Sequence, residues 1–348
     1  MAEITFESFG KTKDGREVTR CILSAGEYTA KVLTLGGILQ SFQVPAPEGK
    51  RDIVLGCETP IQYQEQTNYL GAIIGRVANR ISQASFVLNG NTYPLAANNG
   101  TNCLHGGRRG KGFDSVLWDA EEQDGNLVLH YSSADGEEGF PGRLEVQVTY
   151  SLSAYGALTL NYQAESDKDT LCNLTNHSYF NLRGHKFGSL EGHRLQIDAE
   201  EVTEIDDTGA PNGRIFSVEG TPFDLREPVD IPEQLEKSHP QLELGGGFDH
   251  NFILGREPQN PLQLAAKAWA DGLCLECLTT QPGVQLYTAN FLEPTPGKQG
   301  AHYDRRAAFC LETQGWPDAI HHPDFPSAVL KAGETYRQTT VYRVVAEK

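Results

Sequence analysis

The sequence has few basic residues and no long hydrophobic run. It contains 29 Lys and Arg against 46 Asp and Glu in 348 residues, which gives a formal net charge of -17. Because nucleic acids and anionic membranes both attract clustered Lys and Arg, this balance argues against either as the main partner. No segment approaches the length of a membrane span. Residues 1–7 show no basic region followed by an apolar run, so no signal peptide is predicted.

Paired cysteine motifs are also scarce. The seven cysteines are an odd number and are scattered along the chain. Cys172 and Cys310 lie in apolar runs, where a reduced cysteine behaves as a small hydrophobic residue. Cys274 and Cys277 form a lone Cys-x-x-Cys without a second pair nearby, which is weak evidence for zinc or redox chemistry. We therefore expect a cytoplasmic protein with free thiols.

Helical periodicity is rare, whereas short alternating strands are common. Asn89-Gly90 separates two short strand-like runs, 86–88 and 91–93, and supplies the positive φ angles of a type I′ hairpin turn. Alternation of apolar and polar residues marks further strands at 127–131, 144–152 and 158–162. Glycine and proline interrupt the chain often, and no repeat or linker divides it. We expect an all-β sandwich or barrel that forms one domain over residues 1–348.

The stretch 171–182 gathers uncharged polar residues around one histidine. If it is a strand, one of its faces is largely apolar and the other is polar. The polar face carries Asn173, Thr175, His177, Tyr179 and Asn181. This face has no Lys, Arg, Asp or Glu, although a face open to bulk water usually carries some. Such groups around His177 fit a cleft for a small polar ligand, and they fit equally a buried histidine that is hydrogen-bonded to its neighbours.

Glu312 is the second residue that could carry chemistry. It lies in the apolar run 309–314, on the opposite side from Phe309 and Leu311. A carboxylate at such a position is costly to bury unless it is paired. Partial burial would raise its pKa and make it a better base near neutral pH. A structural salt bridge would account for it equally well.

Four shorter motifs could hold a polar ligand, and each has a plain structural alternative. Arg76 and Arg80 offer planar hydrogen-bond donors that suit oxygen-rich ligands, unless both arginines are structural. His105 precedes two glycines, which allow a sharp turn or a close approach to a ligand. Asp249 follows three glycines, and its carboxylate could accept two hydroxyl hydrogen bonds or cap a turn. Gln285 lies on a polar strand face that could equally be solvated.

Taken in order along the chain, these motifs resemble those of the aldose 1-epimerases, or galactose mutarotases. The resemblance runs from Gly75 to the C-terminus and includes the closing region 330–336. It implies a galactose mutarotase-like β-supersandwich and a carbohydrate isomerase of hexose metabolism. The reaction would interconvert the α and β anomers of galactose, glucose and related aldohexoses without a cofactor or a metal. The preference between galactose and glucose stays open, as does the choice between a monomer and a homodimer.

The resemblance also assigns roles to residues. His177 would be the general acid that protonates the ring oxygen, and Glu312 the general base that takes the proton from the anomeric hydroxyl. After rotation about C1–C2, the aldehyde would reclose on its other face with the roles reversed. The sugar hydroxyls would be held by Asn79, Arg80, His105, Tyr179 or its neighbour Ser178, Asp249 and Gln285. Ordinary pKa values of about 6.5 for histidine and 4.3 for glutamate already favour an ionised Glu312 at neutral pH, and a nearby carboxylate would keep His177 protonated.

Four other interpretations stay open. Asp249 and Glu312 could be the carboxylate pair of a glycoside hydrolase or lyase. The chain could be a sugar-binding module without catalysis. His105, His177 and a carboxylate could bind a transition metal. The basic cluster at 108–111, beside His105, also leaves open a phosphorylated sugar.

Overall fold

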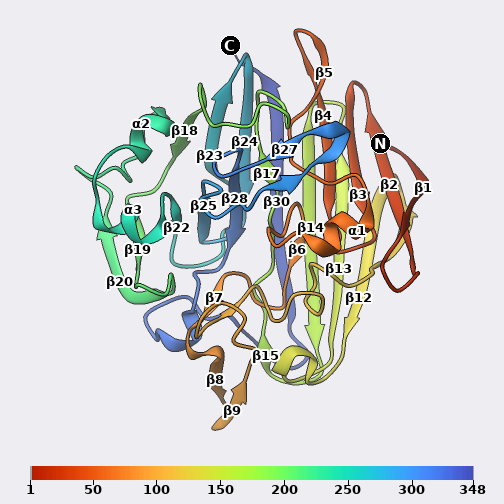
Figure 1. Cartoon of the computed structure of the whole chain (residues 1–348). Coiled ribbons are helices and arrows are strands. Elements are labelled where there is room, and N and C mark those ends of the chain that lie inside the picture. The colour runs from red at the N-terminus through yellow and green to blue at the C-terminus, as the bar shows by residue number, and fades with distance from the viewer. Residues whose placement is uncertain (1, 348) are drawn as a thin grey trace.

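The structure is a computed structural model that describes residues 2–347, and its regular secondary structure is almost wholly β-strand (Figure 1). The predicted domain also includes Met1 and Lys348, which lie outside the described residues. Within the described chain, most strands belong to three antiparallel sheets of nine, six and five strands. The all-β prediction is therefore confirmed.

The largest sheet has nine strands and supplies one wall of the core. In order across the sheet they are β11 (Asp119–Gln123), β12 (Asn126–Ser133), β13 (Leu144–Leu152), β14 (Ala157–Ser166), β30 (Thr335–Ala346), β24 (Leu273–Thr279), β23 (Gln263–Ala270), β18 (Arg194–Ile197) and β21 (Val229–Asp230). β12, β13 and β14 confirm the three strands predicted from alternation. Every second side chain of β13 is buried, as expected of a strand with one face on the core.

The six-stranded sheet carries Tyr179, Asp249 and Glu312 of the site described below. In order its strands are β17 (Tyr179–Phe180), β28 (Phe309–Gln314), β25 (Gly283–Tyr287), β22 (Asp249–Ile253), β19 (Glu201–Ile205) and β20 (Pro211–Ser217). β25 and β28 are buried along their whole length. Val284, Leu286, Phe309 and Leu311 pack into the same core as the inner face of β13. The other face of these two strands is therefore free to carry polar groups.

The third sheet is formed by the N-terminal part of the chain. Its strands are β1 (Glu3–Lys11), β2 (Glu17–Ala25), β3 (Tyr28–Leu33), β4 (Leu39–Ala46) and β5 (Gly49–Asp52). Leu23, Val32 and Phe42 join the main core. All three sheets therefore contribute side chains to one hydrophobic cluster.

The remaining elements are short. Two-stranded pairs join β6 (Ile73–Ile74) to β16 (Thr175–Asn176), β7 (Arg80–Ile81) to β10 (Cys103–Leu104), β8 (Ser85–Leu88) to β9 (Asn91–Pro94), β15 (Thr170–Leu171) to β29 (Val329–Leu330), and β26 (Thr295–Pro296) to β27 (His302–Tyr303). The α-helices are α1 (Pro60–Glu65), α2 (Ile231–Leu235) and α3 (Pro240–Gly245). None of the described helices has the length and apolar character needed to cross a bilayer. β8 and β9 confirm the predicted hairpin, which projects from the lower end of the molecule in Figure 1.

The prediction of one strand over residues 171–182 is wrong. This stretch is broken into β15, β16 and β17, and each of these pairs with a different partner strand. Here asparagine side chains add hydrogen bonds to the backbone of neighbouring segments, beside short backbone bridges such as the one between Val77 and Asn173. The Asn173 amide accepts from the N–H of Gly315 and donates to its carbonyl, and Asn176 donates to the carbonyl of Gly71. Because these side chains pair the backbone of neighbouring segments, the chain bends here without leaving those groups unsatisfied.

Candidate active site

One cavity gathers most of the residues predicted from the sequence. Its volume is about 370 Å³, within the range of small-molecule sites. Seven of the nine predicted residues line it, namely Asn79, Arg80, His105, His177, Tyr179, Asp249 and Glu312. They come from segments far apart in the sequence, so the cavity exists only in the folded chain.

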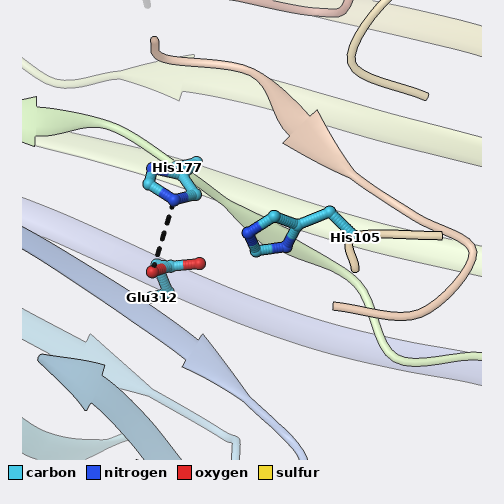
Figure 2. A group of neighbouring side chains, drawn as sticks. All are labelled: His105, His177 and Glu312. Carbon is cyan, nitrogen blue, oxygen red and sulfur yellow. Dashed lines mark ion pairs between the residues drawn. The ribbon is translucent and has the colours of Figure 1, made fainter. Parts of the chain in front are cut away.

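Glu312 and His177 form the buried end of the cavity. Glu312 lies on β28 and His177 directly follows β16, and these residues are 2% and 4% exposed. Figure 2 shows their side chains and that of His105 close together, carried by separate segments. Nε2 of His177 lies 3.7 Å from Oε1 of Glu312, which is too long for a direct hydrogen bond. An imidazole and a carboxyl that face one space can give and take protons within the same turnover.

Aromatic rings surround the imidazole of His177. The rings of Tyr179 and Tyr69 lie roughly parallel to it, with centroids at 5.0 Å and 6.0 Å. The ring of His105 meets it edge-on at 5.2 Å. Nδ1 of His177 lies 3.6 Å from Sγ of Cys310. These contacts hold the plane of the imidazole at the wall of the cavity.

Burial changes the ionisation of this pair from the one expected. Burial lowers the pKa of His177 to about 4. Burial, followed by the charge of Asp249, raises the pKa of Glu312 well above its usual range, and the charge of Arg80 offsets only part of this. The 3.7 Å spacing would suit an ion pair, but removing both charges from water disfavours it. Without sugar, burial therefore favours a neutral His177 beside a protonated Glu312, whereas ordinary pKa values favour an ionised Glu312 beside a protonated His177.

Asp249 is held at the side of the cavity by its neighbours. It begins β22, and in the strand register it lies opposite Tyr287. Its Oδ1 accepts a 2.7 Å hydrogen bond from the Gln285 amide, and its Oδ2 lies 3.8 Å from the guanidinium of Arg80. Burial raises the pKa of Asp249, while Arg80 and Gln285 oppose the rise. The carboxyl is thus fixed in direction with room to accept hydroxyl groups.

Tight turns present Asn79 and His105 to the cavity. Both residues adopt left-handed backbone angles, with φ of 60° and 55°. The N–H of Asn79 donates to Nδ1 of His105 at 3.2 Å, so Nε2 is left for the cavity. Burial lowers the pKa of His105 well below its usual range, which makes it neutral. Glycine is required at 106, because a Cβ there would lie 2.1 Å from the carbonyl oxygen of Gly75.

Two predicted residues do not line the cavity. The hydroxyl of Ser178 donates to the side chain of Asn176, and Ser178 is 1% exposed. Gln285 is also buried, and its amide reaches Asp249 instead of the cavity. In this arrangement any effect of Gln285 on a ligand passes through Asp249.

Sequence reasoning missed several residues of the cavity wall. Tyr287 lines it beside Asp249, and the only sequence signal was that it shares a strand face with Gln285. Tyr69 stacks on His177 from a turn with no motif of its own. Exposed residues surround the mouth, and they are Thr67, Asp207, Thr208, Leu244, Phe291 and Glu293.

Comparison with known proteins decides the family. The family model described as Aldose 1-epimerase matches residues 20–343. The chain belongs to the aldose 1-epimerase family. The galactose mutarotase of Sus scrofa is 42% identical over 343 residues, which cover 98% of each chain. The aldose 1-epimerase of Escherichia coli K12 is 36% identical over 335 residues, which cover 94% of this chain and 95% of that one.

A solved structure supports the same conclusion. The crystal structure of the GalM/aldose epimerase homologue from C. elegans is 28% identical in sequence, with a TM-score of 0.85 over the whole of both chains. The resemblance noted in the sequence and the predicted galactose mutarotase-like fold are therefore confirmed. An aldose 1-epimerase acts on aldohexoses, so the cavity should take a small neutral sugar.

The basic cluster at 108–111 does not make this aldose 1-epimerase cavity cationic. None of its residues lines the cavity, and the Arg109 guanidinium donates to the carbonyl of Tyr63. The mouth instead carries the carboxylates of Asp207 and Glu293.

His105, His177 and Glu312 also form the one group in the described chain that could hold a metal ion. Each offers one ligand atom, and these atoms all lie within 4.8 Å of one another. Two imidazoles and one carboxylate are a donor set that catalytic zinc accepts. The same three side chains can also act by proton transfer alone, so a chelation experiment must decide between the two.

Arg76→Ala and Arg80→Ala should fail in different ways. Arg76 is 2% exposed and donates to the Ser133 hydroxyl and to three carbonyls, those of Ser133, Ala134 and Pro141. Leaving buried acceptors unpaired costs about 1–3 kcal/mol each, so Arg76→Ala should lower Tm by several degrees.

Arg80 lines the cavity and donates to Asn99. Losing this charged donor should cost about 1.5–3 kcal/mol of binding, or roughly 10- to 100-fold in kcat/KM, with the fold intact. If Arg76→Ala and Arg80→Ala are equally stable and lose kcat/KM equally, a structural role for Arg76 and a sugar-binding role for Arg80 are contradicted.

Proposed function

We propose that His177 and Glu312 carry out the anomer interconversion of aldohexoses in this chain. The chain has the aldose 1-epimerase activity of its family and is a carbohydrate isomerase. Mutarotation adds a proton to the ring oxygen and removes one from the anomeric hydroxyl, so it needs an acid and a base. The observation that supports these two residues most directly is their pairing, 3.7 Å apart, at the buried end of the cavity.

The ionisation of the pair fits both halves of the reaction. In ring opening, His177 protonates the ring oxygen while Glu312 takes the proton of the anomeric hydroxyl. This leaves an imidazole and a carboxylic acid, which is the state that burial favours without sugar. Ring closure on the other face of the aldehyde returns both protons. Sugar hydroxyls that donate to the Glu312 carboxylate would stabilise the charged state from which ring opening starts.

Galactose and glucose are the proposed substrates, in unphosphorylated form. Asp249 would accept hydroxyl hydrogen bonds, and Asn79, Arg80 and His105 would hold further hydroxyls along the same wall. The neutral imidazole of His105 suits an uncharged ligand. Galactose 6-phosphate should be a much poorer substrate, because its phosphate would meet the acidic mouth.

Polarimetry with a chelator tests the activity and its cofactor requirement together. We expect the protein to speed the mutarotation of fresh α-D-galactose and EDTA to leave that rate unchanged, because one acid and one base suffice. Loss of the rate on chelation, with recovery on added zinc, would place a metal among His105, His177 and Glu312. Release of reducing sugar from a glycoside would indicate a hydrolase. A protein that binds galactose but does not raise mutarotation above its spontaneous rate would be a binding module.

The pH dependence of kcat/KM should reflect the shifted pKa values of the free enzyme. Catalysis needs the form in which His177 and Glu312 together hold one titratable proton. The rate should fall on the acid side as His177 takes up a second proton, near its pKa of about 4. It should fall on the alkaline side as Glu312 loses its proton, at a pKa raised above the usual range of a carboxyl. Both values belong to the coupled pair, and polarimetry from acid to alkaline pH measures them. An acid limb at or above the ordinary histidine pKa of about 6.5 would contradict the account.

Location, assembly and domain organisation stay predictions. All seven cysteines are buried and free, which supports a reducing compartment such as the cytoplasm. The match of one family model to residues 20–343 supports a single domain over 1–348. A monomer or a homodimer is predicted, and light scattering distinguishes them.

A further inference from the structure

Two tyrosine rings fix the plane of the His177 imidazole but not its direction. The interplanar angles are 27° to Tyr179 and 26° to Tyr69. A flip of 180° about the Cβ–Cγ bond keeps that plane and exchanges ring nitrogens with ring carbons. Stacking on an aromatic ring does not distinguish these two orientations. A directional contact is therefore needed to keep Nε2 toward Glu312.

Cys310 provides that contact. Its Sγ lies 3.6 Å from Nδ1 of His177, and no other described residue gives Nδ1 a hydrogen-bond partner. Cys310 is fully buried on β28, two residues before Glu312 and on the same face of the strand. It also lies opposite Tyr179 in the pairing of β17 with β28. One strand thus carries both the base and the thiol that contacts the acid.

Burial raises the pKa of the Cys310 thiol well above its usual range, so the sulfur keeps its proton. A thiol is a weak donor and a weak acceptor. It can accept from Nδ1–H in the neutral imidazole and in the imidazolium alike, so the contact persists while Nε2 gains and loses its proton. A carboxylate in the same place would favour the charged imidazole alone. A thiol suits a histidine that gains and loses a proton in every turnover.

We infer that Cys310 is a positioning residue for the acid, whose sulfur accepts from Nδ1–H of His177 and so keeps the proton of the neutral imidazole on Nδ1, which leaves Nε2 free to take a proton back from the sugar. The inference rests on the proposed role of His177. It replaces the expectation, drawn from the sequence, that Cys310 is a small hydrophobic residue of the strand. The sulfur does fill buried space, but it also contacts the one side chain whose nitrogen must face the sugar.

Four variants of the full chain test this inference. Cys310→Ala removes the acceptor and Cys310→Ser keeps one, and Cys277→Ala and Cys277→Ser are matched controls. Cys277 is also fully buried, on β24, and does not line the cavity. The readouts are kcat and KM for α-D-galactose, and the ¹⁵N shifts of the His177 ring in sugar-free protein at neutral pH. His177→Gln identifies the resonances.

In the wild type we expect the proton of the neutral imidazole on Nδ1. Cys310→Ser should keep this tautomer, and its kcat should be within about threefold of the wild-type value. Cys310→Ala should mix the two tautomers and lower kcat roughly three- to tenfold with KM unchanged, as for one lost hydrogen bond. Both Cys277 variants should match the wild type. If Cys310→Ala does not fold, the wild-type spectrum and Cys310→Ser still decide the question.

Several results would overturn the inference. One is a neutral wild-type imidazole protonated on Nε2. A second is a Cys310→Ala variant that keeps the wild-type tautomer and kcat. A third is a Cys310→Ser variant as slow as Cys310→Ala, and a fourth is a Cys277→Ala variant that loses as much kcat as Cys310→Ala. The ¹⁵N shifts report the tautomer without an activity measurement. They therefore separate failure of this inference from failure of the proposed role of His177.

Discussion

Glu312→Gln is expected to lower kcat for galactose mutarotation by about 10²–10⁴-fold and to leave KM nearly unchanged. Glutamine keeps the shape of the side chain and its capacity for hydrogen bonds, but it cannot take the proton of the anomeric hydroxyl. The lost interaction belongs to the transition state, so the effect should be seen in kcat. Polarimetry over a range of galactose concentrations separates kcat from KM.

The fold should not suffer from this change. Oε2 of Glu312 is buried and has no hydrogen-bond partner among the described residues, so an amide breaks no bond at that atom. Thermal unfolding should therefore show a Tm close to that of the wild type. Glu276→Gln is a suitable control, because Glu276 lies on β24, pairs with Lys267 and Arg343 and does not line the cavity. It should keep the wild-type kcat, whereas a near-normal kcat in Glu312→Gln would remove the proposed base.

His177→Asn should produce a loss of similar size, about 10²–10⁴-fold in kcat. Asparagine keeps a polar group near the sugar but cannot donate a proton to the ring oxygen. The double variant should be little worse than the slower single variant, because residues that act as a unit give non-additive losses. Fully additive losses, measured with all variants folded, would mean that the two side chains act in separate steps.

The sequence allowed the large strands to be predicted, since each has one face on the core. β12, β13 and β14 alternate cleanly, and Asn89-Gly90 specifies the hairpin of β8 and β9 through its backbone angles. The stretch 171–182 alternates too, yet it is not one strand. Its partners are three separate segments, and the side chains of Asn173 and Asn176 add hydrogen bonds to the backbone of neighbouring segments. Alternation does not reveal which strand lies alongside.

The same limit applies to the site. Motifs indicated His177, Glu312 and Asp249, because their residue types carry the chemistry. Ser178 was predicted with them, but in the structure its hydroxyl bonds to Asn176 and not to the cavity.

The neighbours of these residues could not be predicted, because they depend on register. Tyr287 meets Asp249 across β25 and β22. The 3.6 Å contact of Cys310 with His177 arises because β17 and the residues before it run beside β28. The ionisation of His177 and Glu312 could not be predicted either, because it depends on how deeply they are buried. Burial favours a neutral His177 and a protonated Glu312, the reverse of what ordinary pKa values favour.

The most direct measurement is the optical rotation of freshly dissolved α-D-galactose, followed with the wild type and with the Glu312→Gln/His177→Asn double variant at equal concentration. The account predicts that the wild type brings the rotation to its equilibrium value well ahead of the spontaneous reaction, while the folded double variant follows close to the spontaneous curve. A double variant that keeps pace with the wild type would contradict the claim that these two side chains move the protons.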